Sequence, residues 1–320
     1  MIVLTGGAGF IGSCFLKKLN DNGIYDIVVV DHLGNGQKWK NLIGKRFRRY
    51  VDKTEFRQKY MNRDFGNTVD TIFHFGACSA TTESDCDYIM DNNLNYSIEL
   101  AEFAQNNYIR MIYASSAATY GDGSDGYSDK EFNSLRPLNA YGFSKSLFDH
   151  WVIDCFLDNS LTGLKFFNVF GPNEYHKGDM ASMIYKAYVQ VKDTGTVKLF
   201  KSITDEYADG EQMRDFVYVK DCVDIIWKIY SNNDFAGIYN LGTGIARSWN
   251  SLANAVFQSM QSKTSIDYIE MPDSLVKQYQ NFTEADMTKL NSTKCAHTFL
   301  SLEDSIEDYL KNYLIPEKYY

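Results

Sequence analysis

Short apolar runs alternate with longer amphipathic stretches through the first half of the chain. Five runs have the length of a strand: MIVLT (1–5), DIVVVD (26–31), DTIFHFG (70–76), RMIYASS (110–116) and GLKFFNV (163–169). None alternates strictly between apolar and polar residues, which is typical of strands buried on both faces of a parallel sheet. Segments of helix length, such as 85–107 and 141–158, separate them. This order predicts a doubly wound α/β fold with a parallel sheet, of the Rossmann type.

The segment 141–158 has the clearest helical period. Its apolar stripe consists of Leu147, Phe148, Trp151, Val152, Cys155 and Phe156. Because these positions repeat every three to four residues, we expect them to face the core together.

After about residue 169 this rhythm loosens. We expect loops at 171–180 and 202–213, while FVYVKDCVDII (216–226) predicts one more strand and helix that return to the main sheet. The prediction is therefore a dinucleotide-binding domain of residues 1–168 completed by 214–242. Residues 169–213 and 243–320 would form a smaller, discontinuous α/β lobe that binds the substrate.

Composition narrows the class of protein. The 320 residues are 44% hydrophobic and carry a net charge of −9 without a block of like charges, which argues against a nucleic-acid partner. An anionic ligand is compatible with this charge if its pocket is locally basic. No segment looks like a signal peptide or a membrane span, and we predict a cytoplasmic protein without a metal site. Six cysteines without a C-x-x-C pair are expected to be reduced and mostly buried: Cys14, Cys78, Cys86, Cys155, Cys222 and Cys295.

A glycine-rich turn, VLTGGAGFIGSCF, follows the first predicted strand. Gly7, Gly9 and Gly12 fit G-x-G-x-x-G, and Gly6, Gly9 and Gly12 fit the looser G-x-x-G-x-x-G. Such a turn lacks Cβ atoms because its backbone must approach a pyrophosphate. The helix beginning near Phe10 would offer its free N–H groups to the phosphates. We predict a dinucleotide site, with an ordinary tight turn as the alternative.

The second strand ends in Asp31, 19 residues after Gly12, where an acid binds the adenosine ribose of NAD. Lys38, Lys40 and His32 follow, and a cation there pairs with the 2′-phosphate of NADP. These residues alone leave the choice of cofactor open, and leave Lys38 the alternative of a solvated loop charge.

NAYGFSKSLFDHW places Tyr141 and Lys145 four residues apart at the start of a helix. The pKa of a free tyrosine is about 10, and a neighbouring ammonium group lowers it. Lys145 would also hold the nicotinamide ribose. Ser116, in YASSAATYG, stands at a strand end, where α/β sheets bind ligands. With 23 tyrosines in the chain, a chance Tyr-x-x-x-Lys is the alternative.

Together with FFNVFGP and RDFVYV, these motifs resemble the extended short-chain dehydrogenase/reductase family over essentially the whole chain. The resemblance implies that Tyr141 is the acid/base, Lys145 its electrostatic partner and Ser116 the anchor of the substrate hydroxyl. It also implies a nucleotide-linked sugar as substrate. Dehydratases of this family have an Asp-Glu pair where this chain has Ala117-Ala118, so dehydration is disfavoured.

Three longer stretches resemble the ADP-glyceromanno-heptose 6-epimerases: NVFGPNEYHKGDMAS, FHFGACSATTE and YNLGTG. This resemblance implies Lys177 as a second acid/base opposite Tyr141, a transient 6-keto sugar and NADP as cofactor, with NAD as the alternative. For Lys177 the alternatives are a solvated loop lysine and an active His176. For the protein they are another nucleotide-sugar epimerase or reductase, for instance acting at carbon 4, and a non-catalytic NADP-sensing scaffold.

The resemblance assigns further site residues. For the cofactor they are Gly6, Gly9, Phe10, Ile11, Gly12, Asp31, His32, Lys38, Lys53, Phe75, Gly76, Ala77, Cys78, Ser79, Asn92, Lys145, Val169 and Lys177. For the substrate they are Asn168, Asp179, Lys186, Phe200, Lys201, Ser202, Arg214 and Tyr279. Arg214 is the expected bidentate partner of the ADP pyrophosphate, a surface pair with Asp215 being the alternative.

The chain departs from the family in three places. Phe75 replaces an acid, Asp179 replaces a serine, and the acidic loop 202–213 is longer. An acidic loop beside a pyrophosphate weakens binding unless it points outward. The resemblance also implies a role in making the precursor of the lipopolysaccharide inner core, and a homo-oligomer, such as a pentamer. The segment 85–107 is a candidate contact face, with ordinary core packing as the alternative.

Overall fold

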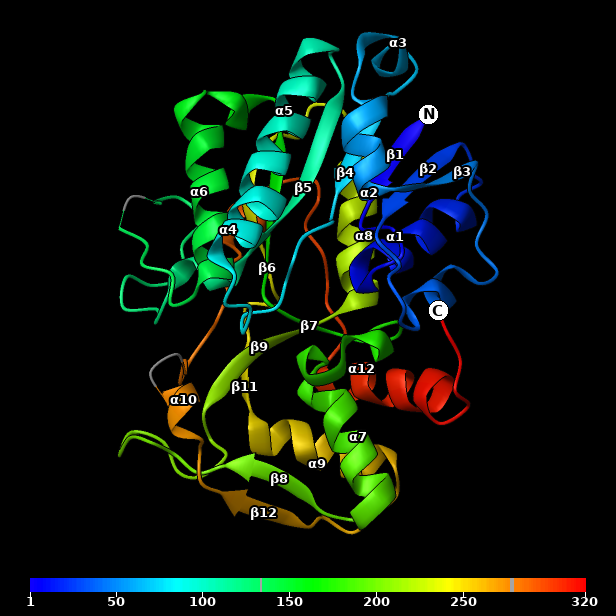
Figure 1. Ribbon diagram of the computed structural model, residues 1–320. Helices are drawn as coiled ribbons and strands as arrows, with labels where there is room; N and C mark the ends of the chain where they lie inside the picture. Colours follow the sequence, from blue (N-terminus) through cyan, green and yellow to red (C-terminus); the bar gives the residue numbers. More distant parts are fainter. Residues whose placement is uncertain (133, 277–278) are drawn as a thin grey trace.

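Seven parallel strands form the main sheet in the order β10-β6-β5-β4-β1-β2-β3 (Figure 1). The computed structural model describes residues 1–132, 134–276 and 279–320. The strands are β1 (Ile2–Thr5), β2 (Ile27–Asp31), β3 (Arg49–Asp52), β4 (Thr71–His74), β5 (Arg110–Ser116), β6 (Thr162–Phe166) and β10 (Gly237–Leu241). The predicted doubly wound sheet is confirmed.

Consecutive residues of each inner strand enter two different hydrophobic cores. In β1, Leu4 packs on one face and Val3 on the other; in β2, Val29 and Val30 divide in the same way. Successive side chains of a strand point to opposite faces. Both faces of this sheet are covered, so both positions must be apolar, which explains the uninterrupted apolar runs.

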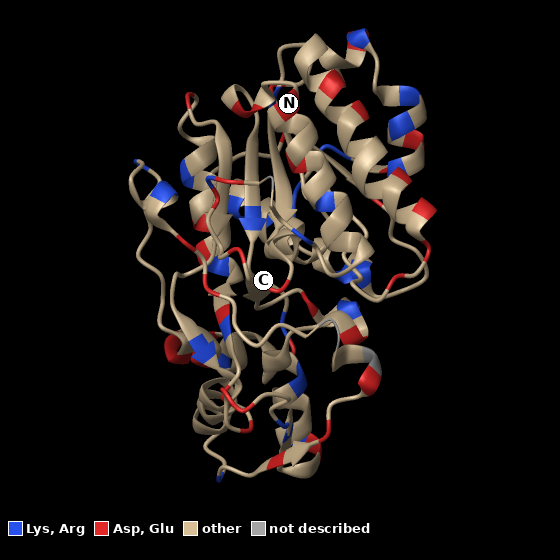
Figure 2. Cartoon of the chain, turned by 90° about the vertical axis from the view of Figure 1, so that its left-hand side faces the viewer, with Lys and Arg blue, Asp and Glu red and all other residues tan. Residues whose placement is uncertain are grey.

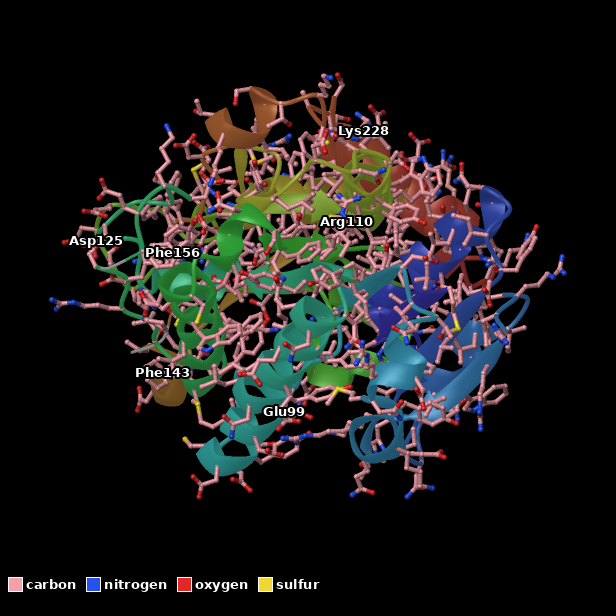
Figure 3. All side chains as sticks on the ribbon, turned by 90° about the horizontal axis from the view of Figure 1, so that it is seen from above. Glu99, Arg110, Asp125, Phe143, Phe156 and Lys228 are labelled. Carbon is pink, nitrogen blue, oxygen red and sulfur yellow. The ribbon has the colours of Figure 1, made fainter. Side chains whose placement is uncertain are left out.

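Helices cover the two faces (Figure 1). On one face lie α1 (Phe10–Asp21) and α8 (Val219–Tyr230), which contact each other. On the other lie α4 (Cys86–Ile89), a π-helical turn (Met90–Asn95), α5 (Tyr96–Asn106) and α6 (Ala140–Asp154). Arg110, labelled in Figure 3, fixes the start of β5 to the end of α8 by donating to the carbonyls of Ile229 and Tyr230 at 2.7 and 2.8 Å.

Short helical segments fill the connections of this part. They are η1 (Lys38–Leu42), α2 (Lys53–Glu55), the π-helical turn Phe56–Tyr60, α3 (Arg63–Gly66), η4 (Ala117–Tyr120) and η5 (Leu157–Asn159).

A smaller part lies beyond the carboxyl edge of the main sheet (Figure 1). Its strands form two small sheets, β11-β9-β7 and β12-β8, from β7 (Asn168–Phe170), β8 (Val197–Phe200), β9 (Met213–Tyr218), β11 (Ala246–Ser248) and β12 (Ile266–Ile269). Its helical segments are η6 (Tyr175–Met180), α7 (Met183–Thr194), α9 (Trp249–Ser259), α10 (Asp273–Val276), α12 (Leu302–Tyr309) and the π-helical turn Leu310–Leu314. Helix α11 (Thr288–Asn291) contacts β10 of the main sheet.

Three expectations about these elements need correction. The strand predicted from FVYV does not return to the main sheet, because β9 pairs with β7 and β11; α8 and β10 do return. The stripe of 141–158 stops early: α6 ends at Asp154 and Phe156 turns outward with a φ of +57° and an exposure of 81% (Figure 3). Three of the six cysteines are buried rather than most of them.

No helix in the described ranges is both long and apolar enough to cross a membrane.

Candidate active site

A cavity of about 910 Å³ opens where the main sheet meets the smaller part. The carboxyl ends of β1, β2, β4 and β5 form one side of it, and β7, α7, β8, α9 and β12 supply the other. This is the edge at which doubly wound sheets bind their ligands. All the residues predicted to be catalytic or to hold the cofactor line this cavity, from Gly6 to Lys177.

The glycine turn is packed tightly against its own backbone and against the loop after β4. A Cβ on Gly12 would lie 2.1 Å from the Gly6 carbonyl oxygen, and one on Gly6 would lie 2.5 Å from the Gly76 nitrogen. Gly6 also has a φ of +68°. Helix α1 begins at Phe10 without a side-chain cap, so its first N–H groups are free to bind phosphate. These features fit a dinucleotide.

Asp31 is buried and fully engaged by donors. Its carboxylate accepts hydrogen bonds from the N–H groups of Ala8 at 2.8 Å and His32 at 2.7 Å, and forms an ion pair with Lys38. Lys38 is therefore no freely solvated charge. Because Lys38 neutralises Asp31, this corner presents no unpaired carboxylate to a bound ligand.

Residues that follow β3 and β4 also line the cavity. Lys53 donates to the amide oxygen of Asn92 at 2.6 Å and lies 5.5 Å from the ring centroid of Tyr88. The loop from Phe75 to Ser79 lies beside them along the cavity.

Tyr141 and Lys145 sit in the first two turns of α6, which begins with the side chain of Asn139 accepting the Gly142 N–H at 2.8 Å. The buried Lys145 donates to the Ala114 carbonyl at 2.8 Å, and burial lowers its pKa to about 8. Burial raises the pKa of Tyr141, while the neighbouring Ser116 hydroxyl opposes that rise. The pKa of Tyr141 is therefore raised, whereas a lowering was expected from Lys145 alone. Desolvation of the phenol outweighs the effect of the nearby groups.

Lys177 lines the cavity from η6. Its ammonium lies 5.5 Å from the ring centroid of Phe10, the first residue of α1. No residue in the described ranges forms an ion pair with it, and burial lowers its pKa. A half-buried amine in a cavity does not match a lysine solvated in a loop.

His176 also lines the cavity, but its ring is engaged. Nδ1 lies 3.1 Å from the Asn173 carbonyl and 3.2 Å from the amide nitrogen of Asn41. Burial, with the charges of Lys38 and Lys177, lowers its pKa to about 4. The imidazole is therefore neutral near pH 7, which makes it a poor proton donor there.

The predicted substrate residues divide into two groups. Asn168, Lys186, Phe200 and Tyr279 line the cavity, whereas Asp179, Lys201, Ser202 and Arg214 do not. Three residues of the second group are either exposed or in contact with other parts of the protein. Asp179 is exposed and its carbonyl accepts from Lys186 at 2.7 Å. Lys201 pairs with Glu270 at 2.5 Å, and the Ser202 N–H donates to Asp209 at 2.8 Å.

Arg214 lies just behind the cavity wall. Its guanidinium is 5.0 and 5.5 Å from the ring centroids of Tyr279 and Trp249, both of which line the cavity. Asp215 does not pair with it; its carboxylate accepts the N–H groups of Thr243 and Gly244. The alternative of an ordinary Arg–Asp surface pair is therefore wrong.

The acidic loop 202–213 points away from the cavity. Asp205, Glu206 and Glu211 are exposed, and none of the loop's carboxylates lines the cavity. Asp209 is turned back to accept the Ser202 N–H. The predicted electrostatic penalty is avoided by this orientation.

Sequence reasoning missed other residues of the site. Tyr88, Lys198 and Trp249 line the cavity, and Glu174 lies directly beneath η6. The spacing of Lys198 to Phe200 in a strand puts both on one face, a signal that was available. Nothing in the local pattern distinguishes Tyr88 or Trp249 from other aromatic residues, since only packing brings them here.

The fold and this arrangement of glycine turn, tyrosine and lysines define a dinucleotide-dependent enzyme acting on small molecules. Residues 2–242 match the model of the NAD dependent epimerase/dehydratase family, and the chain belongs to that family.

The chain is also similar to proteins of narrower description. It is 51% identical over 316 residues to an ADP-L-glycero-D-manno-heptose-6-epimerase of Nitratidesulfovibrio vulgaris, covering 98% of each chain. It is 46% identical to one of Fusobacterium nucleatum, with both chains covered completely. The solved structure of the Helicobacter pylori protein of that name superposes with a TM-score of 0.80 at 30% identity, over 97% of this chain and 95% of that one. The predicted resemblance to ADP-glyceromanno-heptose 6-epimerases is thereby confirmed.

Structural likeness extends more widely than this. A UDP-N-acetylglucosamine 4-epimerase of Methanobrevibacter ruminantium superposes with a TM-score of 0.83 at 22% identity, over 99% of this chain and 98% of that one. At that identity the likeness shows the shared fold alone.

Proposed function

We propose that the protein inverts carbon 6 of ADP-D-glycero-D-manno-heptose to give the L-glycero epimer, with NADP as its cofactor. The observation that carries the proposal is that Tyr141 of α6 and Lys177 of η6 line one cavity. An epimerase must give hydride back to the other face of a ketone, so the oxygen occupies two positions. Two acid/base groups in one cavity, Tyr141 and Lys177, suit that requirement. Identity of 51% with a relative of this name supports the substrate.

Residues around the glycine turn would hold the dinucleotide, with its phosphates on the free N–H groups at the start of α1. When bound, the nicotinamide supplies reversible hydride transfer at carbon 6, so no net oxidation occurs. The Lys38–Asp31 pair favours NADP, because it leaves no unpaired carboxylate to repel a 2′-phosphate. NAD is the alternative.

Tyr141 would remove the proton of the C6 hydroxyl as the C–H bond breaks, and Ser116 would hold that oxygen. Burial raises the pKa of Tyr141, so its ionisation requires positive charge nearby. Lys145 provides one such charge, fixed on the Ala114 carbonyl, and the oxidised nicotinamide provides the other.

Lys177 would give a proton to the oxygen once the sugar has turned within the site. Burial lowers its pKa towards the range in which an amine exchanges protons near neutral pH. The neutral His176, with its Nδ1 facing Asn173 and Asn41, suits that step less well.

Another epimerase of the same family, for instance one acting at carbon 4, is the second candidate, because the family that the chain matches is described as one of epimerases and dehydratases. That reaction would use Tyr141 and leave Lys177 without a role. In either case the substrate is a nucleotide sugar. The product of the carbon-6 enzyme would serve as a precursor of the lipopolysaccharide inner core.

The test is to incubate the purified protein with ADP-D-glycero-β-D-manno-heptose without added nicotinamide, and to follow the configuration of carbon 6 by proton NMR. We expect the L-glycero epimer to appear without accumulation of ketone or reduced cofactor. No conversion after NADP and NAD are supplied would overturn the proposal. Inversion of a UDP-sugar at carbon 4 instead would support the second candidate.

A further inference from the structure

The loop that carries Lys177 also contains a buried carboxylate. Glu174 is 0% exposed and immediately precedes η6. It does not line the cavity, and the chemistry described above gives it no part.

Four donors converge on this carboxylate. Oε1 accepts hydrogen bonds from the Gly171 N–H at 3.2 Å, the Ser182 hydroxyl at 2.7 Å and the Tyr309 hydroxyl at 3.1 Å. Oε2 accepts the Ser182 N–H at 2.6 Å. A carboxylate can accept all four hydrogen bonds, and each of its oxygens faces a backbone N–H group, which can only donate. Burial raises the pKa of Glu174, and the hydrogen bonds from Ser182 and Gly171 oppose that rise by stabilising the ionised form.

These contacts close the loop that presents Lys177. Gly171 directly follows β7 and Ser182 caps α7, so Glu174 joins the two ends of the 171–182 loop. Tyr309 connects the same carboxylate to α12. The Glu174 carbonyl accepts the Lys177 N–H at 2.9 Å, which fixes the lysine one turn further on.

The charge of Glu174 also acts on the amine. Burial lowers the pKa of Lys177 and Glu174 opposes that shift. Lys38 and Asp31 act on the neighbouring His176. Tyr175 and Tyr185 act on Tyr309, which donates to Glu174. Asp31 is already neutralised by Lys38, so Glu174 is the carboxylate that acts on Lys177.

We propose that Glu174 is the positioning residue of Lys177, closing the loop that aims the amine into the cavity and supplying the negative charge that sets its protonation. The catalytic importance of this role rests on the proposed function; the effect on the amine does not.

The first readout is independent of any enzyme activity. Lysines are reductively methylated with ¹³C-formaldehyde, the Lys177 signal is assigned with Lys177→Arg, and its pKa is read by NMR titration. We compare the wild type, Glu174→Gln and Tyr309→Phe, which removes one donor and keeps the carboxylate. Glu174→Gln should lower the pKa of Lys177 by about one unit, because it removes the negative charge that raises this pKa. Tyr309→Phe should leave it close to the wild type.

The second readout is epimerisation. Glu174→Gln should lower kcat by about tenfold or more, with KM within about twofold of the wild type and with unchanged cofactor content. Tyr309→Phe should retain most of kcat. If Glu174→Gln does not fold, Glu174→Asp, which is one methylene shorter, should show the same loss of kcat.

An unchanged Lys177 titration in Glu174→Gln overturns the inference, whatever the activity. Wild-type protein that fails to epimerise overturns the proposed function instead, and the titration still decides the role of Glu174.

Discussion

Several lysine side chains line this cavity, and each is controlled by its own surroundings. Lys145 is buried on the Ala114 carbonyl, and its pKa is lowered to about 8. Lys38 is paired with Asp31, and Lys177 has no ion-pair partner in the described ranges. Sequence spacing finds such residues, but burial and pairing decide their chemistry.

Replacing either acid/base group tests the residue-level proposal. Lys177→Ala and Tyr141→Phe should each slow epimerisation by about 10²–10⁴-fold while the cofactor stays bound, because each removes one proton transfer. Lys192→Ala, on the solvent side of α7 beside Glu317, is the matched lysine control. Rates and cofactor content are measured by NMR and by absorbance after denaturation. If Lys177→Ala turns over as fast as Lys192→Ala, Lys177 has no part in the reaction.

At the scale of elements, helix α6 organises more than the Tyr141–Lys145 pair. Asp149 lies a turn beyond Lys145 and is fully buried with its partner Lys165 of β6, at 2.6 Å. Ser115 and Tyr113 of β5 also donate to Asp149, at 2.6 and 3.0 Å. The ion pair fixes α6 to β6, and the two hydrogen bonds fix it to β5.

Breaking this buried pair should be costly. Lys165→Met leaves the Asp149 carboxylate uncompensated, so the free energy of unfolding should fall by about 3–5 kcal/mol. The control is Lys201→Met, which breaks the exposed pair with Glu270, 81% exposed, and should change the free energy of unfolding little, because solvent screens an exposed ion pair. Urea unfolding followed by circular dichroism measures both. Equal losses in the two variants would contradict the structural role given to the Asp149–Lys165 pair.

At the scale of the whole molecule, an acidic protein encloses a basic cavity. The net charge is −9, and acidic and basic residues are interspersed along the chain (Figure 2). Six lysines nevertheless line the cavity with a single carboxylate, the neutralised Asp31: they are Lys38, Lys53, Lys145, Lys177, Lys186 and Lys198. The locally basic pocket that an anionic ligand requires is therefore present.

This contrast predicts the sign of a salt effect. ADP should bind more weakly as salt rises, by about tenfold between about 0.05 and 0.5 M KCl, because nearby lysines attract it and salt screens them. Isothermal titration calorimetry measures the affinity. Lys198→Gln should reduce the salt dependence, and Lys192→Gln should not. Tighter binding at high salt would mean that the net negative charge dominates.

Two predictions at this scale stay predictions: the homo-oligomer and the division into residues 1–168 with 214–242 against the remainder. Identity with relatives bears on neither.

The sequence by itself determined the fold class, the glycine turn and the strand ends that meet at the cavity, whereas Lys53, Asn92 and Val169 were expected only from the resemblance to the family. These features depend on short-range patterns: apolar runs buried on two faces, turns that exclude a Cβ, and side chains one helical turn apart. Strand ends in a parallel sheet meet at one edge, so Gly6, Asp31 and Ser116 could be brought together without coordinates.

Only the tertiary structure decided the rest of the site. Arg214 lies behind Trp249 and Tyr279, and the acidic loop turns outward, because of how α9, β9 and β12 pack. In the sequence, Glu174 is an ordinary acidic residue of a loop. Only the folded structure shows that Gly171, Ser182 and Tyr309 donate hydrogen bonds to its carboxylate. Such contacts join residues far apart in the chain, and their charge and hydrogen-bond partners depend on burial that no local pattern encodes.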